Sequence, residues 1–166
     1  MKNIATKTAL PLILGLSFFF GTSSADAQHY GCPALRVAYC GCEGLSLRCG
    51  PGTSYHKHGV LYHGTQLIPT GESRWSCGVL WQKVSVKGLM QIGCGCSGSL
   101  TQTGYGHWTV NKTSSMYSSP SAGTHRLGKI YCGTRVQGCH QQYGYLYAHL
   151  DGWVAVRTAS GKVYVH

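Results

Sequence analysis

Acidic side chains are the scarcest class in this chain of 166 residues, with 4 Asp and Glu against 14 Lys and Arg. Charged residues of both signs make up only 11% of the sequence. An enzyme with a cysteine nucleophile needs a histidine base and a third, orienting group. Because carboxylates are so few, little is left for that third role. No cysteine-peptidase motif is recognisable either, so we expect a protein that is not an enzyme.

The chain also lacks a long apolar stripe at helical spacing after its N-terminal segment. Glycine and tyrosine are abundant instead, with 24 and 11 residues. Short segments that alternate between apolar and polar residues, broken by glycines, are typical of strands and tight turns. We therefore expect an all-β protein. No stretch after residue 27 is long and apolar enough to cross a membrane as a helix.

The first 27 residues have the features of a secretory signal peptide. Two lysines make the start positive, residues 10–20 are apolar, and Ala25-Asp26-Ala27 matches the small-x-small pattern of a cleavage site. Cleavage after Ala27 would leave a mature chain that begins at Gln28. The alternative is an uncleaved anchor, but the apolar segment is short for a membrane span. We expect an exported protein, either periplasmic or extracellular.

All nine cysteines follow the expected cleavage site. Outside the cytosol such cysteines usually form disulfides. Nine is odd, so at most four bonds form and one thiol is left over. The candidates are Cys40, Cys42, Cys49, Cys77, Cys94, Cys96, Cys132 and Cys139, which leaves Cys32 as the odd one.

Two Cys-Gly-Cys segments are the most unusual local feature. Residues two apart in a strand point to the same face, so two such segments side by side can form two crosslinks. Small barrels bury little apolar surface, and each disulfide adds about 2–4 kcal/mol of stability. The connectivity stays open, and the pairs we consider are Cys40 with Cys96, Cys42 with Cys94, Cys132 with Cys139, and Cys49 with Cys77.

Metal binding is the rival role for the cysteines. Structural zinc sites use cysteine pairs separated by two to four residues, whereas one residue separates each pair here. His56, His58 and His63 offer a second possible metal site, but surface histidines in a turn explain them more simply. We therefore expect no metal and no cofactor. A catalytic cysteine would find possible bases in His56, His58, His63, His125, His140 and His149.

The excess of basic residues gives the chain a formal net charge of +10. Such a surface favours anionic partners such as wall polymers, lipopolysaccharide or phospholipid headgroups. Solubility alone is the simpler explanation. The lysines and arginines are scattered singly, without the blocks typical of nucleic-acid-binding segments. We expect no nucleic-acid partner.

The sequence contains an internal repeat. Residues 45–67 match residues 114–136 at an offset of 69, and the offset then falls to 64. The first copy therefore carries five extra residues in its middle loop, where a length change costs little. The aligned positions include Gly59 over Gly128, Gly64-Thr65 over Gly133-Thr134, Trp81 over Tyr145, Val86 over Leu150, and Lys87-Gly88 over Asp151-Gly152.

The repeat predicts two small domains joined by a Gly- and Thr-rich linker. We expect a signal peptide at 1–27, a cysteine-containing segment at 28–44 that adds a strand or clamp, a first barrel at 45–97, a linker at 98–107, and a second barrel at 108–166.

The string Leu45-Ser-Leu-Arg-Cys-Gly-Pro-Gly-Thr-Ser-Tyr55 resembles the opening signature of bacterial SH3-like (SH3b) domains. The Gly-x-x-x-x-Gly-Thr element that ends at Thr65 and the later Gly152-Trp153-Val154 continue the family pattern. The resemblance covers nearly all of residues 45–166 and implies two SH3-like barrels in tandem. Two departures are Leu89-Met90, where the family has Trp-Val, and Met116-Tyr117-Ser118, where it has valine, arginine and a small residue.

The resemblance implies a non-catalytic protein that contacts peptidoglycan or its peptide parts, with avidity from its two modules. Small β-barrels bind ligands in aromatic-lined grooves. Our candidate ligand-binding residues are Tyr55, Trp75, Tyr143 and Tyr145, which lie near expected turns.

The alternative is a disulfide-stabilised secreted protein that binds another protein, as an inhibitor, an immunity protein or an effector. The extra cysteines favour it, because the usual wall-binding modules do without them. A third hypothesis, a wall hydrolase, leaves no part of the chain for a separate catalytic domain.

Overall fold

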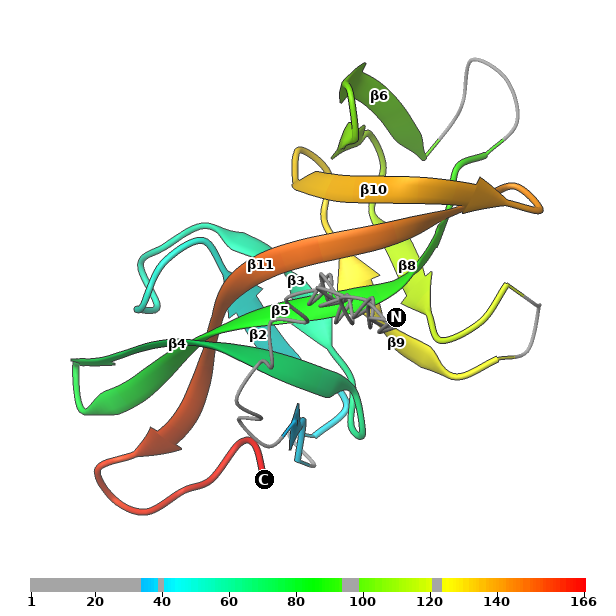
Figure 1. Cartoon of the computed structure of the whole chain (residues 1–166). Helices are drawn as coiled ribbons and strands as arrows, with labels where there is room; N and C mark the ends of the chain where they lie inside the picture. Colours follow the sequence, from blue (N-terminus) through cyan, green and yellow to red (C-terminus); the bar gives the residue numbers. More distant parts are fainter. Residues whose placement is uncertain (1–33, 39–40, 94–98, 121–123) are drawn as a thin grey trace, which may run out of the picture.

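The computed structural model describes residues 34–38, 41–93, 99–120 and 124–166 and shows the expected all-β protein (Figure 1). The described part contains no helix that is long and apolar enough to span a membrane. Its strands are β1 (Leu35–Arg36), β2 (Leu45–Arg48), β3 (Lys57–Leu61), β4 (Gln66–Ser76), β5 (Val79–Gln91), β6 (Leu100–Gly104), β7 (His107–Val110), β8 (Ser114–Tyr117), β9 (Arg126–Ile130), β10 (Arg135–Gln142) and β11 (Tyr145–Thr158).

Six of these strands close a barrel. Neighbours pair in the order β5, β8, β9, β3, β2 and β11, and β11 returns to pair with β5. Closure leaves these strands without an open edge. The longest ladder joins β5 to β11, from Tyr145 opposite Gln91 at one end to Thr158 opposite Val79 at the other. Fully buried core side chains include Leu47, Leu61, Met90, Met116 and Ile130.

The two sequence copies build this barrel together. The first copy supplies β2, β3 and β5, and the second supplies β8, β9 and β11. The prediction of one barrel at 45–97 and another at 108–166 is therefore corrected to a single barrel shared by both copies. The physical reason is edge pairing: short strands from one copy leave backbone groups and apolar faces uncovered, and the other copy covers them.

The contacts between the copies are symmetric. In the pairing of β3 with β9, Val60 lies opposite Lys129, its own counterpart at the offset of 69. In the pairing of β5 with β11, Val86 lies opposite Leu150, its counterpart at the offset of 64. Each copy thus meets the other through the same positions, as subunits do about a two-fold axis.

The repeated Gly-Thr element also joins the copies. In Gly64-Thr65 and Gly133-Thr134 the glycines have positive φ values of 80° and 82°, which glycine adopts readily. Both threonines are buried. The first threonine donates a 2.6 Å hydrogen bond to the carbonyl of Leu127, and the second donates a 3.1 Å bond to the carbonyl of His58. Each bond crosses from one copy to the other.

Strands outside the barrel extend the sheet on both sides. On one side β1 pairs with β4, so the described part of the 28–44 segment does add a strand, as expected. On the other side β7 pairs with β10, and β6 pairs with β7. The predicted linker at 98–107 therefore contains β6 and the turn into β7. A flexible link was expected there, but Leu100 is buried opposite Val110.

The cysteines that the structure describes with their side chains are not bonded. Cys42, Cys49, Cys77 and Cys132 are exposed free thiols, so the predicted bond between Cys49 and Cys77 is not formed. Cys77 has a positive φ of 48° in the tight turn between β4 and β5. The predicted bonds of Cys42 with Cys94 and of Cys132 with Cys139 are likewise not formed, because Cys42 and Cys132 are free. The remaining predicted pair, Cys40 with Cys96, lies outside the described part.

Candidate functional site

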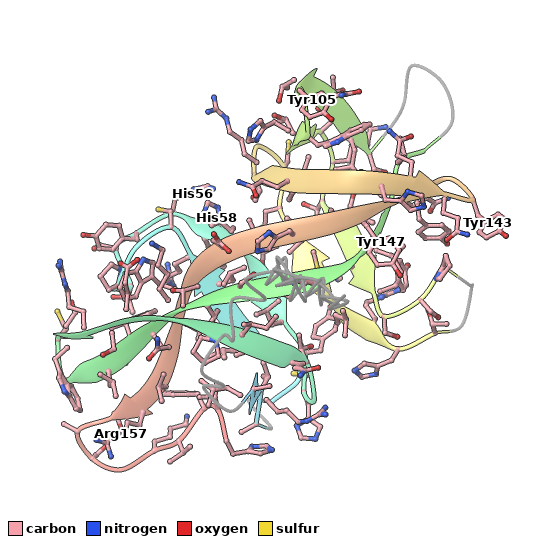
Figure 2. The ribbon with its side chains drawn as sticks, viewed as in Figure 1. His56, His58, Tyr105, Tyr143, Tyr147 and Arg157 are labelled. Atoms are coloured by element: carbon pink, nitrogen blue, oxygen red, sulfur yellow. The ribbon has the colours of Figure 1, made fainter. Side chains whose placement is uncertain are left out.

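The four aromatic residues predicted to bind ligand lie in two separate pairs. Tyr55 and Trp75, 46% and 53% exposed, are near the turn between β4 and β5. Tyr143, 81% exposed, and the half-buried Tyr145 flank the turn between β10 and β11. The length of the β5–β11 ladder separates the two turns. Figure 2 labels Tyr143 at one end and Arg157, whose guanidinium lies over Trp75, at the other.

Each pair has its own local contacts. The guanidinium of Arg157 lies 5.9 Å from the ring centre of Trp75. Tyr145 meets Tyr117 edge to face at 6.4 Å, and Arg126 lies 5.9 Å from the Tyr117 ring centre. Ring and cation contacts of this kind contribute about 0.5–1.5 kcal/mol each. The structure thus places the four predicted residues on two surfaces and does not gather them in one groove.

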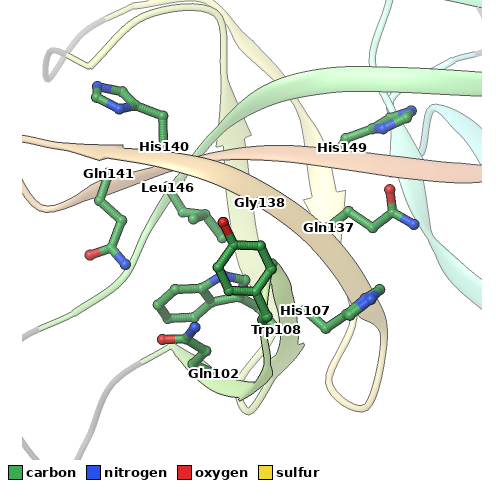
Figure 3. A pocket seen from close by; sticks show the side chains of 11 residues that line it. Gln102, His107, Trp108, Gln137, Gly138, His140, Gln141, Leu146 and His149 are labelled. Atoms are coloured by element: carbon green, nitrogen blue, oxygen red, sulfur yellow. The ribbon is translucent and has the colours of Figure 1, made fainter.

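A cavity of about 680 Å³ opens between the hairpins β6–β7 and β10–β11 (Figure 3). We name it the neutral cleft. Its volume is in the range typical of small-ligand sites. Its lining residues are Gln102, Tyr105, Gly106, His107, Trp108, Gln137, Gly138, His140, Gln141, Leu146 and His149.

Hydrogen-bonding groups without fixed charge dominate this lining. Three glutamine amides, three imidazoles and one phenol supply both donors and acceptors. The lining includes no Asp, Glu, Lys or Arg. Buried Trp108 and Leu146 add apolar surface, and Tyr105 at the β6–β7 turn is fully exposed. Such a cleft suits a ligand that is neutral and rich in hydrogen-bonding groups, with a flat or apolar face.

The register between β7 and β10 positions the cleft. His107 lies opposite Gln137, and Trp108 lies opposite Val136. Successive side chains of a strand point to opposite faces. Trp108 and Val136 are therefore buried, while His107 and Gln137 stay exposed along the rim.

Gly138 shapes the part of the cleft formed by β10. A Cβ at this position would lie 2.5 Å from Cδ1 of Leu146, so the strand passes close over the Leu146 side chain where a glycine leaves room for it. The pairing of β10 with β11 shifts between Gly138 and His140. Such a bulge redirects the side chains that follow it. His140 and Gln141 join the cleft immediately after the shift.

A second cavity of about 380 Å³ adjoins the first, and we name it the charged hollow. It shares His107, Gln137 and His149 with the neutral cleft. It differs in containing two ionic residues, Arg135 and Asp151. Its full lining is His58, His107, Gly133, Arg135, Val136, Gln137, His149, Leu150 and Asp151.

His149 is held in place where the two cavities meet. Its Nε2 lies 3.1 Å from Oδ1 of Asp151 and also contacts Oγ of Ser85. Ser85 and Asp151 pair across the β5–β11 ladder, which is why both reach one imidazole. In a Ser-His-Asp triad the serine and the carboxylate bind opposite ring nitrogens. Here both meet the same nitrogen, so the arrangement orients His149 and does not activate Ser85.

His58 also lines the charged hollow. Its Nδ1 is buried and has no hydrogen-bond partner among the described residues. Burial lowers the pKa of His58 below the ordinary value, and the neighbouring His56, whose ring centre is 6.0 Å away, lowers it further. His58 is therefore neutral at pH 7 in the folded protein.

This lowered pKa predicts that acid destabilises the fold through His58. Below about pH 6.5 the unfolded chain binds a proton at His58 that the folded chain resists, so stability falls as the pH drops from 6.5 towards the folded-state pKa. We expect the free energy of unfolding to decline less on acidification in His58→Gln than in the native protein. Urea unfolding between pH 7.5 and 5 measures this. Parallel pH profiles for the two proteins would contradict the expectation.

The structure brings no metal site together in its described part. No group of three or more His, Cys, Asp or Glu side chains among these residues is arranged to hold a metal ion. The rings of His56 and His58 meet edge to face, with an angle of 73° between their planes.

Reasoning from sequence missed most of the cleft because four of its eleven lining residues come from the predicted linker. Gln102, Tyr105 and His107 all lie within 98–107. The available signal was the run His107-Trp108-Thr109-Val110, which alternates polar and apolar residues as a half-buried strand does.

A scan against protein-family models, a search of curated proteins and a search of solved structures each found no match.

Proposed function

We propose that this is an exported, non-catalytic binding protein that holds peptidoglycan or its peptide parts in the neutral cleft. The observation that carries the proposal is the lining of that cleft, with amides, imidazoles and aromatic rings and no fixed charge. Glycan strands and peptide backbones are neutral along most of their length and rich in donors and acceptors. Aromatic faces stack on sugar rings, and amide groups form hydrogen bonds with the polar groups of the sugar.

Three features of the chain support a wall polymer as the ligand. The net charge of +10 favours approach to an anionic envelope. The resemblance of residues 45–55 to bacterial SH3-like domains also favours a wall ligand, and so does export by an N-terminal signal peptide. Because both copies form one barrel, the avidity expected from two separate modules is not part of it.

A protein partner is the weaker candidate. That alternative drew its support from a network of disulfides, and the four cysteines described with their side chains carry free thiols. The neutral cleft needs no second macromolecule to explain its lining. We therefore keep the wall ligand as the proposal.

Co-sedimentation with purified peptidoglycan sacculi across a salt series tests this function. We expect the native protein to stay in the pellet at high salt, because neutral hydrogen bonds and stacking are not screened. The double variant Tyr105→Ala with Gln141→Ala should bind about tenfold more weakly, which corresponds to the loss of about 1.4 kcal/mol. Both residues are exposed, so the fold should be unaffected.

The matched control is Tyr143→Ala, which removes an aromatic ring 81% exposed at the β10–β11 turn and outside the cleft lining. It should bind as the native protein does. Release of the native protein at moderate salt would show that general charge attraction explains the binding. Equal binding by the cleft variant and the native protein would show that the polymer does not bind in the neutral cleft.

A further inference from the structure

We propose that the charged hollow is a carboxylate-binding subsite, with Arg135 as its anchor. The ligand would then be a glycan or peptide fragment that carries a carboxylate beside its neutral part. This inference rests on the proposed function, because it assigns the charged end of the ligand that the neutral cleft holds.

The geometry joins the two cavities into one binding surface. They share His107, Gln137 and His149, so a ligand in one cavity touches residues that also line the other. Figure 3 shows these three side chains one after another along the rim. A ligand that extends past them from the neutral cleft arrives at Arg135.

Arg135 is a cation without an ion-pair partner among the described residues. It is exposed at the start of β10, where its backbone pairs with Thr109. The described part of the chain has three acidic residues, and Arg135 forms an ion pair with none of them. Glu72 is paired with Lys83, and Asp151 is paired with His149. A guanidinium presents parallel N–H donors that match the two oxygens of a carboxylate.

The rest of the hollow fits a group with a single negative charge. The imidazoles of His58, His107 and His149 supply further hydrogen-bonding groups around Arg135. Asp151 lines the same hollow, and its negative charge opposes a group with two charges, such as a phosphate monoester, more than a carboxylate. The position of Asp151 therefore favours the carboxylate.

A matched pair of ligands tests the subsite. The probes are one disaccharide-tetrapeptide fragment of peptidoglycan with free carboxylates and the same fragment with its carboxylates amidated. By titration calorimetry at low salt we expect the native protein to prefer the free acid by about tenfold, since charged hydrogen bonds are the stronger kind. Arg135→Gln should remove that preference and bind the amidated fragment as the native protein does.

Two further variants make the result specific. Arg74→Gln removes an equal charge from exposed β4, outside both cavities, and should keep the full preference. Arg135→Lys keeps the positive charge but loses the planar guanidinium, so it should keep only part of the preference for the free acid. Equal binding of both fragments by the native protein would overturn the subsite and leave the proposed function standing. Binding of neither fragment would overturn both.

Discussion

Neither copy of the repeat is expected to fold as a monomer by itself. A fragment ending at Gly93 and one beginning at Ser99 should each lack stable β-structure at low concentration, and the structure should return when the two are mixed. Far-UV circular dichroism and thermal unfolding of the separate fragments and of their mixture measure this. The expected effect is large, because each fragment loses its partner along most of the barrel.

The pairing of the strands gives the reason. Four of the six seams of the barrel join one copy to the other: β5 to β8, β9 to β3, β2 to β11, and β11 to β5. Within the first copy, the hairpin β2–β3 and the hairpin β4–β5 do not pair with each other. The first copy is therefore split into separate hairpins, and isolated hairpins are marginal in water. The second copy is split into the hairpin β8–β9 and the sheet β6–β7–β10–β11, which do not pair with each other.

The symmetry of the contacts adds one detail to this expectation. Because Val60 and Val86 lie opposite their own counterparts, a fragment that does fold should do so as a dimer, with the second molecule in place of the missing copy. Sedimentation equilibrium separates the two cases. A folded monomer of either fragment would show that one copy forms a barrel on its own and would contradict the shared barrel.

Substituting either glycine at the β3–β9 seam should cost about 3 kcal/mol of unfolding free energy. A Cβ on Gly59 would lie 2.2 Å from the carbonyl oxygen of Lys129, and a Cβ on Gly128 would lie 2.2 Å from that of Val60. In both cases the obstacle is backbone, which cannot rotate away as the end of a side chain can. Gly59→Ala and Gly128→Ala must therefore push the two strands apart.

The two substitutions should also be coupled. Gly59 lies opposite Ile130 and Gly128 lies opposite Leu61, two residues apart on the same ladder. Once one methyl group has pushed β3 and β9 apart, the second methyl group causes a smaller further loss of unfolding free energy. The double variant should therefore lose less than the sum of the single losses.

Urea unfolding followed by tryptophan fluorescence measures these changes. Gly104→Ala is the matched control, because its Cβ would come no closer than 4.0 Å to its nearest neighbour, Cβ of His107. It should change stability by about 0.5 kcal/mol or less. If Gly59→Ala were no more destabilising than Gly104→Ala, the close approach of β3 and β9 would be contradicted.

What the sequence determined by itself is local. Alternating apolar residues broken by glycines were enough to predict strands, and self-similarity was enough to align Gly64-Thr65 with Gly133-Thr134. The positive φ of both glycines follows from that local pattern. Exposure of Tyr55, Trp75 and Tyr143 near turns was also predictable, since it depends only on where strands end.

The tertiary structure alone decided which strands pair. Equivalent strands of a repeat offer the same backbone groups and similar apolar faces, so sequence cannot say whether a copy pairs with itself or with its neighbour. That choice turned two predicted barrels into one and made Thr65 and Thr134 donors to the opposite copy. Pairing within the second copy built the cleft as well, because only the pairing of β7 with β10 places His107 beside Gln137, thirty positions away in the chain.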